Sequence, residues 1–338
     1  MPQPMNNQQP LQPQKQKSSK LVLLGLIFWL FFVVIVLVNR QNILDQIKLY
    51  GYTAPDSISA LATDDTMSTF ATKVFYVNHP SIDQKTIFSQ NCSSRTEQTI
   101  VIGCYHGNQN GIYLLSVTDQ RLHGVEEVTA AHEMLHAAYD RLDTKERQKI
   151  DLLLNDYYTN TLKDQRIRDE VDAYKTTEPN DITNEMHSIF GTEVGVLPPE
   201  LEGYYQKYFN DRSKVVAYSS AYAGEFTSRR QQVSADDAQL LVLKNQIEVI
   251  TNQLTAQEGE LQVRRNQMQA ERSSGDIQSY NAQVPVYNAA VAAYNAEILS
   301  AKRLITEYNT LVEKRNAIAL EVSELARAIS GDALPQSR

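Results

Sequence analysis

Apolar and polar positions are distributed very unevenly along this chain of 338 residues. Residues 21–38 form an uncharged, almost wholly apolar run, LVLLGLIFWLFFVVIVLV. At a rise of 1.5 Å per residue, a helix of this length just crosses the hydrocarbon layer of a membrane. A cleaved signal peptide fits less well, because the run is long for one and no small-residue cleavage pattern follows it. We expect an uncleaved transmembrane anchor.

The pattern after the apolar run predicts a few strands followed by many helices. KVFYVN at 73–78 is rich in β-branched and aromatic residues, which favours a strand. QTIVIGCY and GIYLLSV flank HGNQNG and predict a β-hairpin. Helical periodicity then covers about 125–142, 144–160, 164–176, 181–190, 199–209 and a longer stretch from about 211. This order indicates an α+β fold that is mainly helical, with a small β-sheet.

The last third of the chain carries a seven-residue repeat. Its first arm places apolar residues at Leu240, Leu243, Ile247, Ile250, Leu254, Leu261 and Met268. Its second arm places them at Tyr280, Val284, Tyr287, Val291, Tyr294, Ile298, Ala301, Ile305, Tyr308 and Val312. RSSGD at 272–276 separates the arms, so the pattern predicts an antiparallel coiled-coil hairpin. Pro285 either begins the second helix or kinks it.

These patterns divide the chain into six segments. They are a disordered tail at 1–20, the anchor at 21–38, a stalk at 39–70, a globular domain at 71–233, the hairpin at 234–330 and a disordered tail at 331–338. The first tail is rich in Gln, Pro and Asn and cannot form a core. Tyrosines at heptad positions are most simply explained as packing, but they suit loosely packed helices. We therefore expect the hairpin to bind a protein partner, to dimerise or to restrict access to a site.

Charge adds an orientation and excludes one class of partner. The net charge is −8 and there is no basic run, so we expect no nucleic-acid surface. Lys15, Lys17 and Lys20 precede the anchor, whereas Arg40 and Lys48 follow it together with an acid. By the positive-inside rule, the N-terminus is cytoplasmic and the main domain extracytoplasmic.

The chain has two cysteines, Cys92 and Cys104. Outside the cytoplasm they could close a loop through a disulfide, and the alternative is a pair of free buried thiols. They lack the Cys-x-x-Cys spacing of a zinc knuckle.

The segment VTAAHEMLHAAYDRL contains the motif His-Glu-x-x-His at 132–136. On a helix His132 and His136 share one face and can direct their nitrogens at one metal ion. Glu133 lies about 100° round the helix, where it can serve as a base without being a ligand. Valines and a leucine share the face of the histidines, so the pair points toward a core. A chance match, with two ordinary core histidines, is the alternative.

A third metal ligand must come from elsewhere in the chain. The metzincin continuation is excluded, because neither Gly nor His follows His136 at the required positions. Glu185, in DITNEMHSIFGTE, lies at the edge of an apolar helical face and is the ligand that we expect. Glu193 is the substitute candidate. Glu170 and Asp172 are weaker, because their segment is highly charged.

The pattern HEMLH followed by Glu185-Met186-His187-Ser188 resembles the gluzincin metallopeptidases. VTAAHEMLHAAYDRL, NEMHSIFGTE and LPPELEGYYQKYF together also resemble a group of uncharacterised bacterial membrane-anchored proteins, over roughly residues 95–215. Ser188 stands where gluzincins usually have Ala, which leaves the ligand position intact. The resemblance implies a zincin-like domain, a bound Zn²⁺, a water nucleophile and an edge strand that aligns a peptide. GIYLLSV is the expected edge strand.

The expected function is therefore that of a membrane-anchored zinc peptidase acting on extracytoplasmic peptides or proteins. His132, His136 and Glu185 would hold the zinc, and Glu133 would act as general base on the zinc-bound water. The oxyanion donor stays open among three residues, His187, His123 and Tyr139. The competing function is a non-catalytic membrane-anchored coiled-coil scaffold whose metal site is structural or degenerate.

Overall fold

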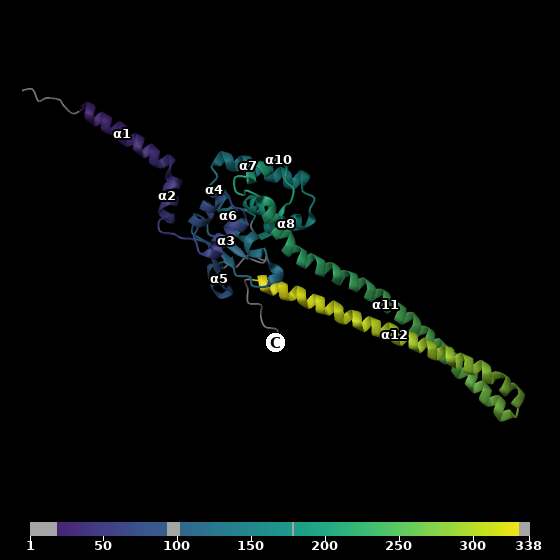
Figure 1. The fold of residues 1–338 in the computed structure, drawn as a ribbon. Coiled ribbons are helices and arrows are strands. Elements are labelled where there is room, and N and C mark those ends of the chain that lie inside the picture. Colours follow the sequence, from purple (N-terminus) through teal and green to yellow (C-terminus); the bar gives the residue numbers. More distant parts are fainter. Residues whose placement is uncertain (1–18, 93–101, 178, 331–338) are drawn as a thin grey trace, which may run out of the picture. The chain divides into compact units, whose positions relative to one another are not determined.

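The computed structural model describes residues 19–92, 102–177 and 179–330 (Figure 1). The chain divides into two compact units, Met1–Pro55 and Asp56–Arg338. In the first unit, the structure describes helices α1 (Ser19–Val38) and α2 (Arg40–Leu49). No single helix in the described part of the chain is both long enough and apolar enough to cross a membrane. A pair bent by 65°, Leu23–Val38 with Arg40–Leu49, meets the criterion of length and composition. The anchor stays a prediction.

The second unit is mainly helical. It begins with α3 (Asp56–Asp64), α4 (Thr69–Val77), β1 (Ser81–Asp83), α5 (Lys85–Asn91), β2 (Gly103–Tyr105), β3 (Ile112–Leu115) and a 3₁₀ turn, η1 (Gln120–Leu122). It continues with α6 (Val125–Tyr139), α7 (Thr144–Asp156), the π-helical turn η2 (Tyr157–Thr161), α8 (Gln165–Thr177), α9 (Ile182–Glu193) and α10 (Pro199–Tyr205). Two long helices follow, α11 (Arg212–Ser274) and α12 (Ile277–Ile329). The predicted α+β composition is confirmed.

The small sheet has the strand order β1-β3-β2. β2 and β3 pair antiparallel with Cys104 opposite Tyr113, which confirms the predicted hairpin. β1 pairs parallel to the other side of β3. The expectation that GIYLLSV forms the edge strand is therefore wrong, because β3 is central and β2 lies at an edge. Residues 98–101 of the first predicted strand lie outside the described residues.

A predicted strand and a predicted boundary at the start of the domain are wrong. Residues 73–77 of KVFYVN belong to helix α4, because the Ser68 side chain accepts a hydrogen bond from the backbone N–H of Ala71 and caps a helix that begins before this stretch. The stalk predicted at 39–70 also ends early. Ile58, Leu61 and Met67 are buried in the core, so the folded domain starts with α3.

Helix α6 occupies the centre of the domain and packs against α3, α4, α9, α11, β2 and β3. A helix covered on so many sides must be apolar around most of its surface. Its contact with α9 is close because residue 191 is Gly. A β-carbon at Gly191 would overlap the Leu135 side chain of α6 and lie 2.7 Å from the Tyr205 ring. This close approach brings the first turn of α9 next to the histidines of α6.

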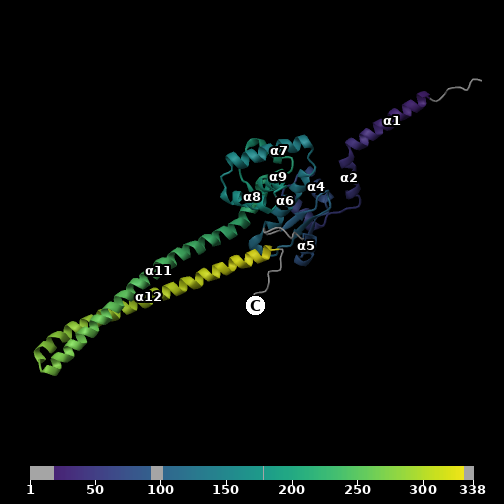
Figure 2. The ribbon, with the colours of Figure 1, turned by 180° about the vertical axis from the view of Figure 1, so that it is seen from behind.

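Helices α11 and α12 run side by side and form the predicted hairpin (Figures 1 and 2). Gly275, at φ +80°, ends α11 in the left-handed conformation that favours glycine. Pro285 lies inside α12, which begins before it at Ile277. The predicted boundary at residues 233–234 is wrong, since α11 continues unbroken from Arg212. In the second arm, half-buried Leu304 takes the seam position expected for Ile305, which is exposed.

The far end of α12 returns to the domain. Leu325 and Ile329 pack with Leu122 and Val125 in one buried apolar cluster. Tyr222 of α11 packs against the same cluster. Both arms of the hairpin are thus fixed to the domain at their bases.

Candidate metal centre

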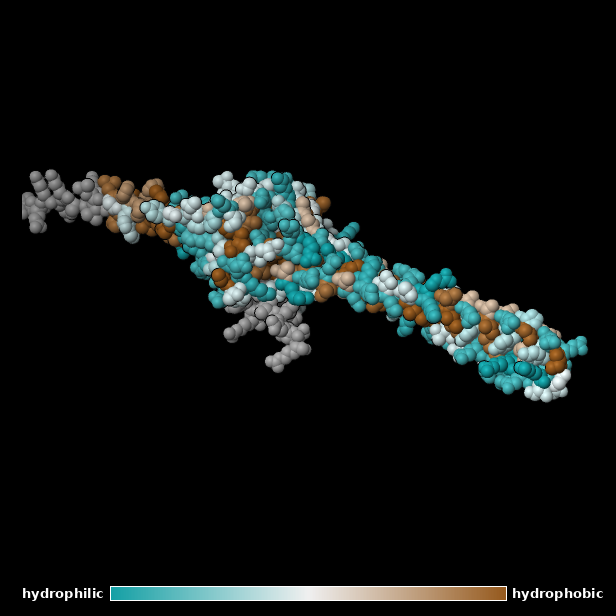
Figure 3. Space-filling view, turned by 60° about the horizontal axis from the view of Figure 1, so that its bottom comes forward, coloured by the Kyte–Doolittle hydropathy of each residue, from teal (hydrophilic) through white to brown (hydrophobic). Residues whose placement is uncertain are grey.

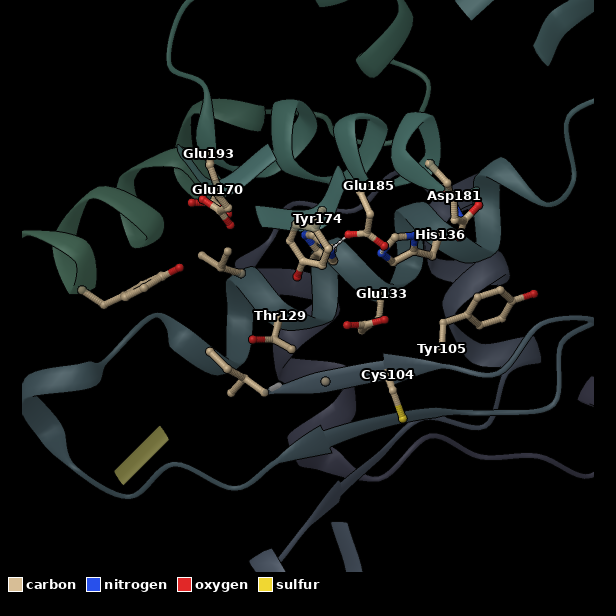
Figure 4. A pocket seen from close by; sticks show the side chains of 16 residues that line it. Cys104, Tyr105, Thr129, Glu133, His136, Glu170, Tyr174, Asp181, Glu185 and Glu193 are labelled. Carbon is tan, nitrogen blue, oxygen red and sulfur yellow. Dashed lines mark hydrogen bonds and ion pairs between the residues drawn. The ribbon is translucent and has the colours of Figure 1, made fainter. Parts of the chain in front are cut away.

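The structure brings His132, His136 and Glu185 together. Their nearest nitrogen and oxygen atoms all lie within 4.8 Å of one another. Nε2 of His132 is 3.7 Å from Oε2 of Glu185, and Nε2 of His136 is 3.5 Å from Oε1 of the same carboxylate. Figure 4 shows the Glu185 carboxylate of α9 beside the His136 side chain of α6. One metal ion could be bound by all three residues.

Electrostatics keep the carboxylate in the form that binds metal. Burial opposes ionisation, yet the neighbouring His136 and His132 lower the pKa of Glu185. Burial likewise opposes protonation of His136, but Glu185 and Glu133 raise the pKa of that histidine. The lowered pKa of Glu185 keeps this carboxylate ionised, whereas His136 must lose the proton that the carboxylates favour before its nitrogen can bind a metal.

Glu133 is buried on α6 beside the cluster and is not one of the three converging residues. Its carboxylate lies on the side of the helix that faces β2, close to Gly103 (Figure 4). A position about 100° from the histidine before it puts the carboxylate next to the candidate metal position rather than on it. Glu133 therefore lies beside the three converging side chains without joining them.

These side chains face a cleft of about 240 Å³. The lining residues come from β2 and the residue before it, from α6, α8, α9 and α11, and from the segment before α9: Ile102, Gly103, Cys104, Tyr105, Val128, Thr129, His132, Glu133, His136, Glu170, Tyr174, Asp181, Asn184, Glu185, Glu193 and Tyr222. A concave site that gathers histidines and carboxylates from several elements is the usual setting for a catalytic centre.

Glu193, the substitute ligand, lies elsewhere in the cleft. Nη1 of Arg166 donates to its Oε2 at 2.6 Å, and the Ser219 hydroxyl donates to the same oxygen at 3.3 Å. Glu170 lies beside it, and burial together with the Glu193 carboxylate raises the pKa of Glu170 well above its ordinary value. Asp172 instead accepts a hydrogen bond from Tyr158 at the surface. These acids are separate from the histidine cluster.

None of the three residues expected as oxyanion donors is among the described residues that line the cleft. His123 is exposed and lies near Glu127, and the Tyr139 hydroxyl donates to Asp151 at 2.7 Å. His187 is fully buried, with Nε2 2.9 Å from the Tyr204 hydroxyl.

Three tyrosines that the sequence did not single out line the cleft instead, and they are Tyr105, Tyr174 and Tyr222. Strand alternation after Gly103 is the signal that could have identified Tyr105. Tyr174 lies in the highly charged segment that forms α8, and the charge of this segment indicated a surface helix. Tyr222 lies on α11, far along the chain from the motif.

A disulfide joins Cys92 and Cys104, with Cα atoms 5.9 Å apart. This confirms the pairing that the sequence allowed. Cys104 lies on β2 and lines the cleft, so the bond ties the strand beside Glu133 to the end of α5. The edge strand is held at one wall of the site.

Two imidazoles and one carboxylate make a donor set that suits Zn²⁺. A closed structural site would supply four protein ligands, whereas three leave a coordination position for water or substrate. Comparison with protein families, curated proteins and solved structures finds no match to this chain. The chemistry of the cleft is therefore argued from its own geometry.

Proposed function

We propose that the protein is a zinc-dependent peptidase. The observation that carries the proposal is the convergence of His132, His136 and Glu185 from two helices, with Glu133 beside them in an open cleft. The donor set fits zinc in residue types and in number, and the low pKa of Glu185 supplies an ionised oxygen ligand. The expected gluzincin-like class has the same arrangement of two histidines, one base and a glutamate from a later helix.

Each residue has a distinct role in the proposed reaction. When bound, zinc would lower the pKa of a water molecule and polarise the scissile carbonyl. His132, His136 and Glu185 hold the ion in place. Glu133 accepts a proton from the attacking water and gives it to the leaving amine. Tyr174, in place of the three donors expected from the sequence, could donate to the developing oxyanion from the wall of the cleft. The Tyr105 hydroxyl already donates to Asp140 at 3.0 Å.

The position of β2 favours a peptide as substrate. One side of Gly103–Tyr105 pairs with β3, and the strand lines the cleft beside Glu133. An extended peptide could add to the other side by backbone hydrogen bonds, which would lay its amide bonds along the cleft. The role expected for GIYLLSV thus passes to β2.

The proposed setting is the outer side of a membrane, with residues 21–38 as a single-pass anchor and the N-terminus in the cytoplasm. The Cys92–Cys104 disulfide supports this setting, because such bonds persist in oxidising compartments. Extracytoplasmic peptides or proteins would then be the substrates. The acidic composition, without a basic run, favours no nucleic-acid partner.

A membrane-anchored scaffold is the second candidate, and the long α11–α12 hairpin favours it. In that function the hairpin would bind partners and the histidine cluster would be structural or degenerate. The open cleft at the cluster favours the peptidase, because a structural site has no need of one.

The test separates metal binding from proton transfer in the purified full-length chain. Replacing His132, His136 or Glu185 by Ala removes a ligand, so zinc content and peptide hydrolysis should fall together. Glu133→Gln keeps the shape but cannot accept a proton, so zinc should stay while hydrolysis falls by roughly 10²–10⁴-fold. Glu146→Gln, at an exposed position of α7, is the matched control and should change neither.

Two results would reject the peptidase. A wild-type chain that binds no zinc near neutral pH would favour the scaffold. A Glu133→Gln variant that hydrolyses peptide at the wild-type rate would show that any activity has another source.

A further inference from the structure

The first arm of the hairpin carries a second heptad repeat on its outer surface. Residues 242–269 consist of four consecutive heptads, VLKNQIE, VITNQLT, AQEGELQ and VRRNQMQ. Their first positions hold Val242, Val249, Ala256 and Val263. Their fourth positions hold Asn245, Asn252, Gly259 and Asn266. These eight residues alternate at spacings of three and four, which is the spacing of a coiled-coil seam.

Packing between α11 and α12 does not explain this repeat. The seam toward α12 is formed by other residues of the same heptads, among them buried Leu243 and half-buried Ile247 and Ile250. The three valines of the second repeat are 55, 57 and 66% exposed. Figure 3 shows apolar residues on the exposed surface along the hairpin. A solvated face needs no seven-residue period, so the repeat indicates a partner helix outside this hairpin.

We propose that this partner is the same face of α11 in a second copy of the chain, with the two helices parallel and in register. In three of the four heptads, parallel pairing sets Val against Val and Asn against Asn, whereas antiparallel pairing sets Val against Asn; the third heptad has Ala256 and Gly259 at these positions. Each Asn amide both donates and accepts, so identical side chains satisfy each other. The face is thus complementary to itself, as a two-fold interface requires.

The charges next to the repeat support a second copy over an unlike partner. The fifth heptad positions hold Gln246, Gln253, Glu260 and Gln267, so three of the four are uncharged amides. Pairing with an unlike helix is commonly directed by opposite charges at such flanking positions. Here two identical faces meet with little repulsion. This surface lies outside the metal centre, and the proposal does not depend on the peptidase function.

Oxidative cross-linking of the full-length chain in membrane vesicles tests the pairing and its direction. The only two native cysteines are already joined, so each new cysteine supplies a single free thiol. Val249→Cys should give a disulfide-linked dimer, because in-register residues at a parallel seam bring their Cα atoms to disulfide distance. Glu258→Cys, exposed on roughly the opposite side of α11, is the control and should give at least five-fold less. Equal yields from the two sites, or no dimer from Val249→Cys, would overturn the proposal.

A second pair of variants tests the apolar residues themselves. Val249→Lys with Val263→Lys places like charges across the proposed interface, so cross-linking through a cysteine at Ala256 should fall by about ten-fold or more. Leu299→Lys with Leu320→Lys changes two exposed apolar residues of α12 and should leave the yield unchanged. A dimer that survives the valine changes, or is lost equally in both variants, would show that another surface pairs the chains.

Discussion

Gly103 of β2 lies directly against Glu133 of α6. A β-carbon at residue 103 would lie 2.8 Å from Oε1 of Glu133 and would overlap the methyl group of Thr129. The strand can approach the helix this closely only because residue 103 has no side chain. The edge strand and the proposed base therefore share one wall of the cleft.

Gly103→Val should slow hydrolysis by roughly ten-fold or more while zinc content stays at the wild-type level, because the new side chain displaces the Glu133 carboxylate and not the metal ligands. Gly107→Val is the matched control, since a β-carbon there meets its nearest neighbour, Asp140, at an ordinary 3.7 Å. Metal analysis and peptide hydrolysis on the same samples check this. Wild-type turnover in the Gly103→Val chain would mean that the approach of β2 to Glu133 has no catalytic importance.

Glu185→Gln and Glu193→Gln should differ in metal content. Glu185 faces both histidines, whereas Glu193 is bound by Arg166 and Ser219. Losing a residue that binds the metal directly typically weakens zinc binding by orders of magnitude. The Glu185→Gln chain should therefore release its zinc at a chelator concentration at which the Glu193→Gln chain keeps it. The reverse order of release would identify Glu193 as the third ligand.

Asp65→Asn should stabilise the protein at neutral pH. Asp65 is fully buried, and neither carboxylate oxygen has a hydrogen-bond partner among the described residues. Burial, Glu127 and Asp64 raise the pKa of Asp65 well above its ordinary value. As the pH rises above about 4, the unfolded chain loses this proton first, so the folded state loses stability until its own higher pKa is passed.

The measurement for Asp65→Asn is thermal unfolding with a chelator present, at pH 4 and at pH 7. The variant should match the wild type at pH 4 and exceed it at pH 7, by roughly 2–4 °C in Tm for each kcal/mol. Glu258→Gln, at an exposed position, is the control, and its Tm difference from the wild type should not increase in this way between pH 4 and pH 7. A Tm difference between Asp65→Asn and the wild type that is as large at pH 4 as at pH 7 would show that ionisation of Asp65 is not the cause.

Leu325→Ala should destabilise the domain by about 2–5 kcal/mol, since it leaves a cavity in the cluster with Leu122, Val125 and Ile329. Leu320→Ala removes the same atoms from a side chain that is 55% exposed and should cost far less. Urea unfolding of both variants measures the difference. Equal stability of the two would show that the base of α12 is not fixed to the domain.

The sequence predicted the elements that local periodicity specifies. The two-strand hairpin, the central motif helix and the coiled coil all follow from repeats of two, 3.6 or 3.5 residues. The prediction of a strand at 73–78 was wrong because it relied on the strand preference of Val, Phe and Tyr. The helix cap at Ser68, five residues earlier, was the stronger signal. The order of strands depends on tertiary packing, so β3 could not be placed at the centre from its own residues.

The three converging residues were predictable because two share a helix and Glu185 borders an apolar stripe. The rest of the cleft was not. Tyr222 reaches it from a helix that begins 76 residues after His136, where Arg212 starts α11. His187 was misjudged as a donor because no local pattern shows that the Tyr204 hydroxyl already occupies its Nε2.

The cluster at the base of α12 also sets an order of events during synthesis. Leu122 and Val125 leave the ribosome about 200 residues before Leu325 and Ile329. Bringing the two segments together costs conformational entropy, which grows only slowly with their separation along the chain. Tyr222, which lines the cleft, packs against this cluster. A nascent chain that lacks α12 therefore has an incomplete support behind this wall of the cleft. Full assembly of the cleft wall is thereby deferred until translation has passed the second arm of the hairpin.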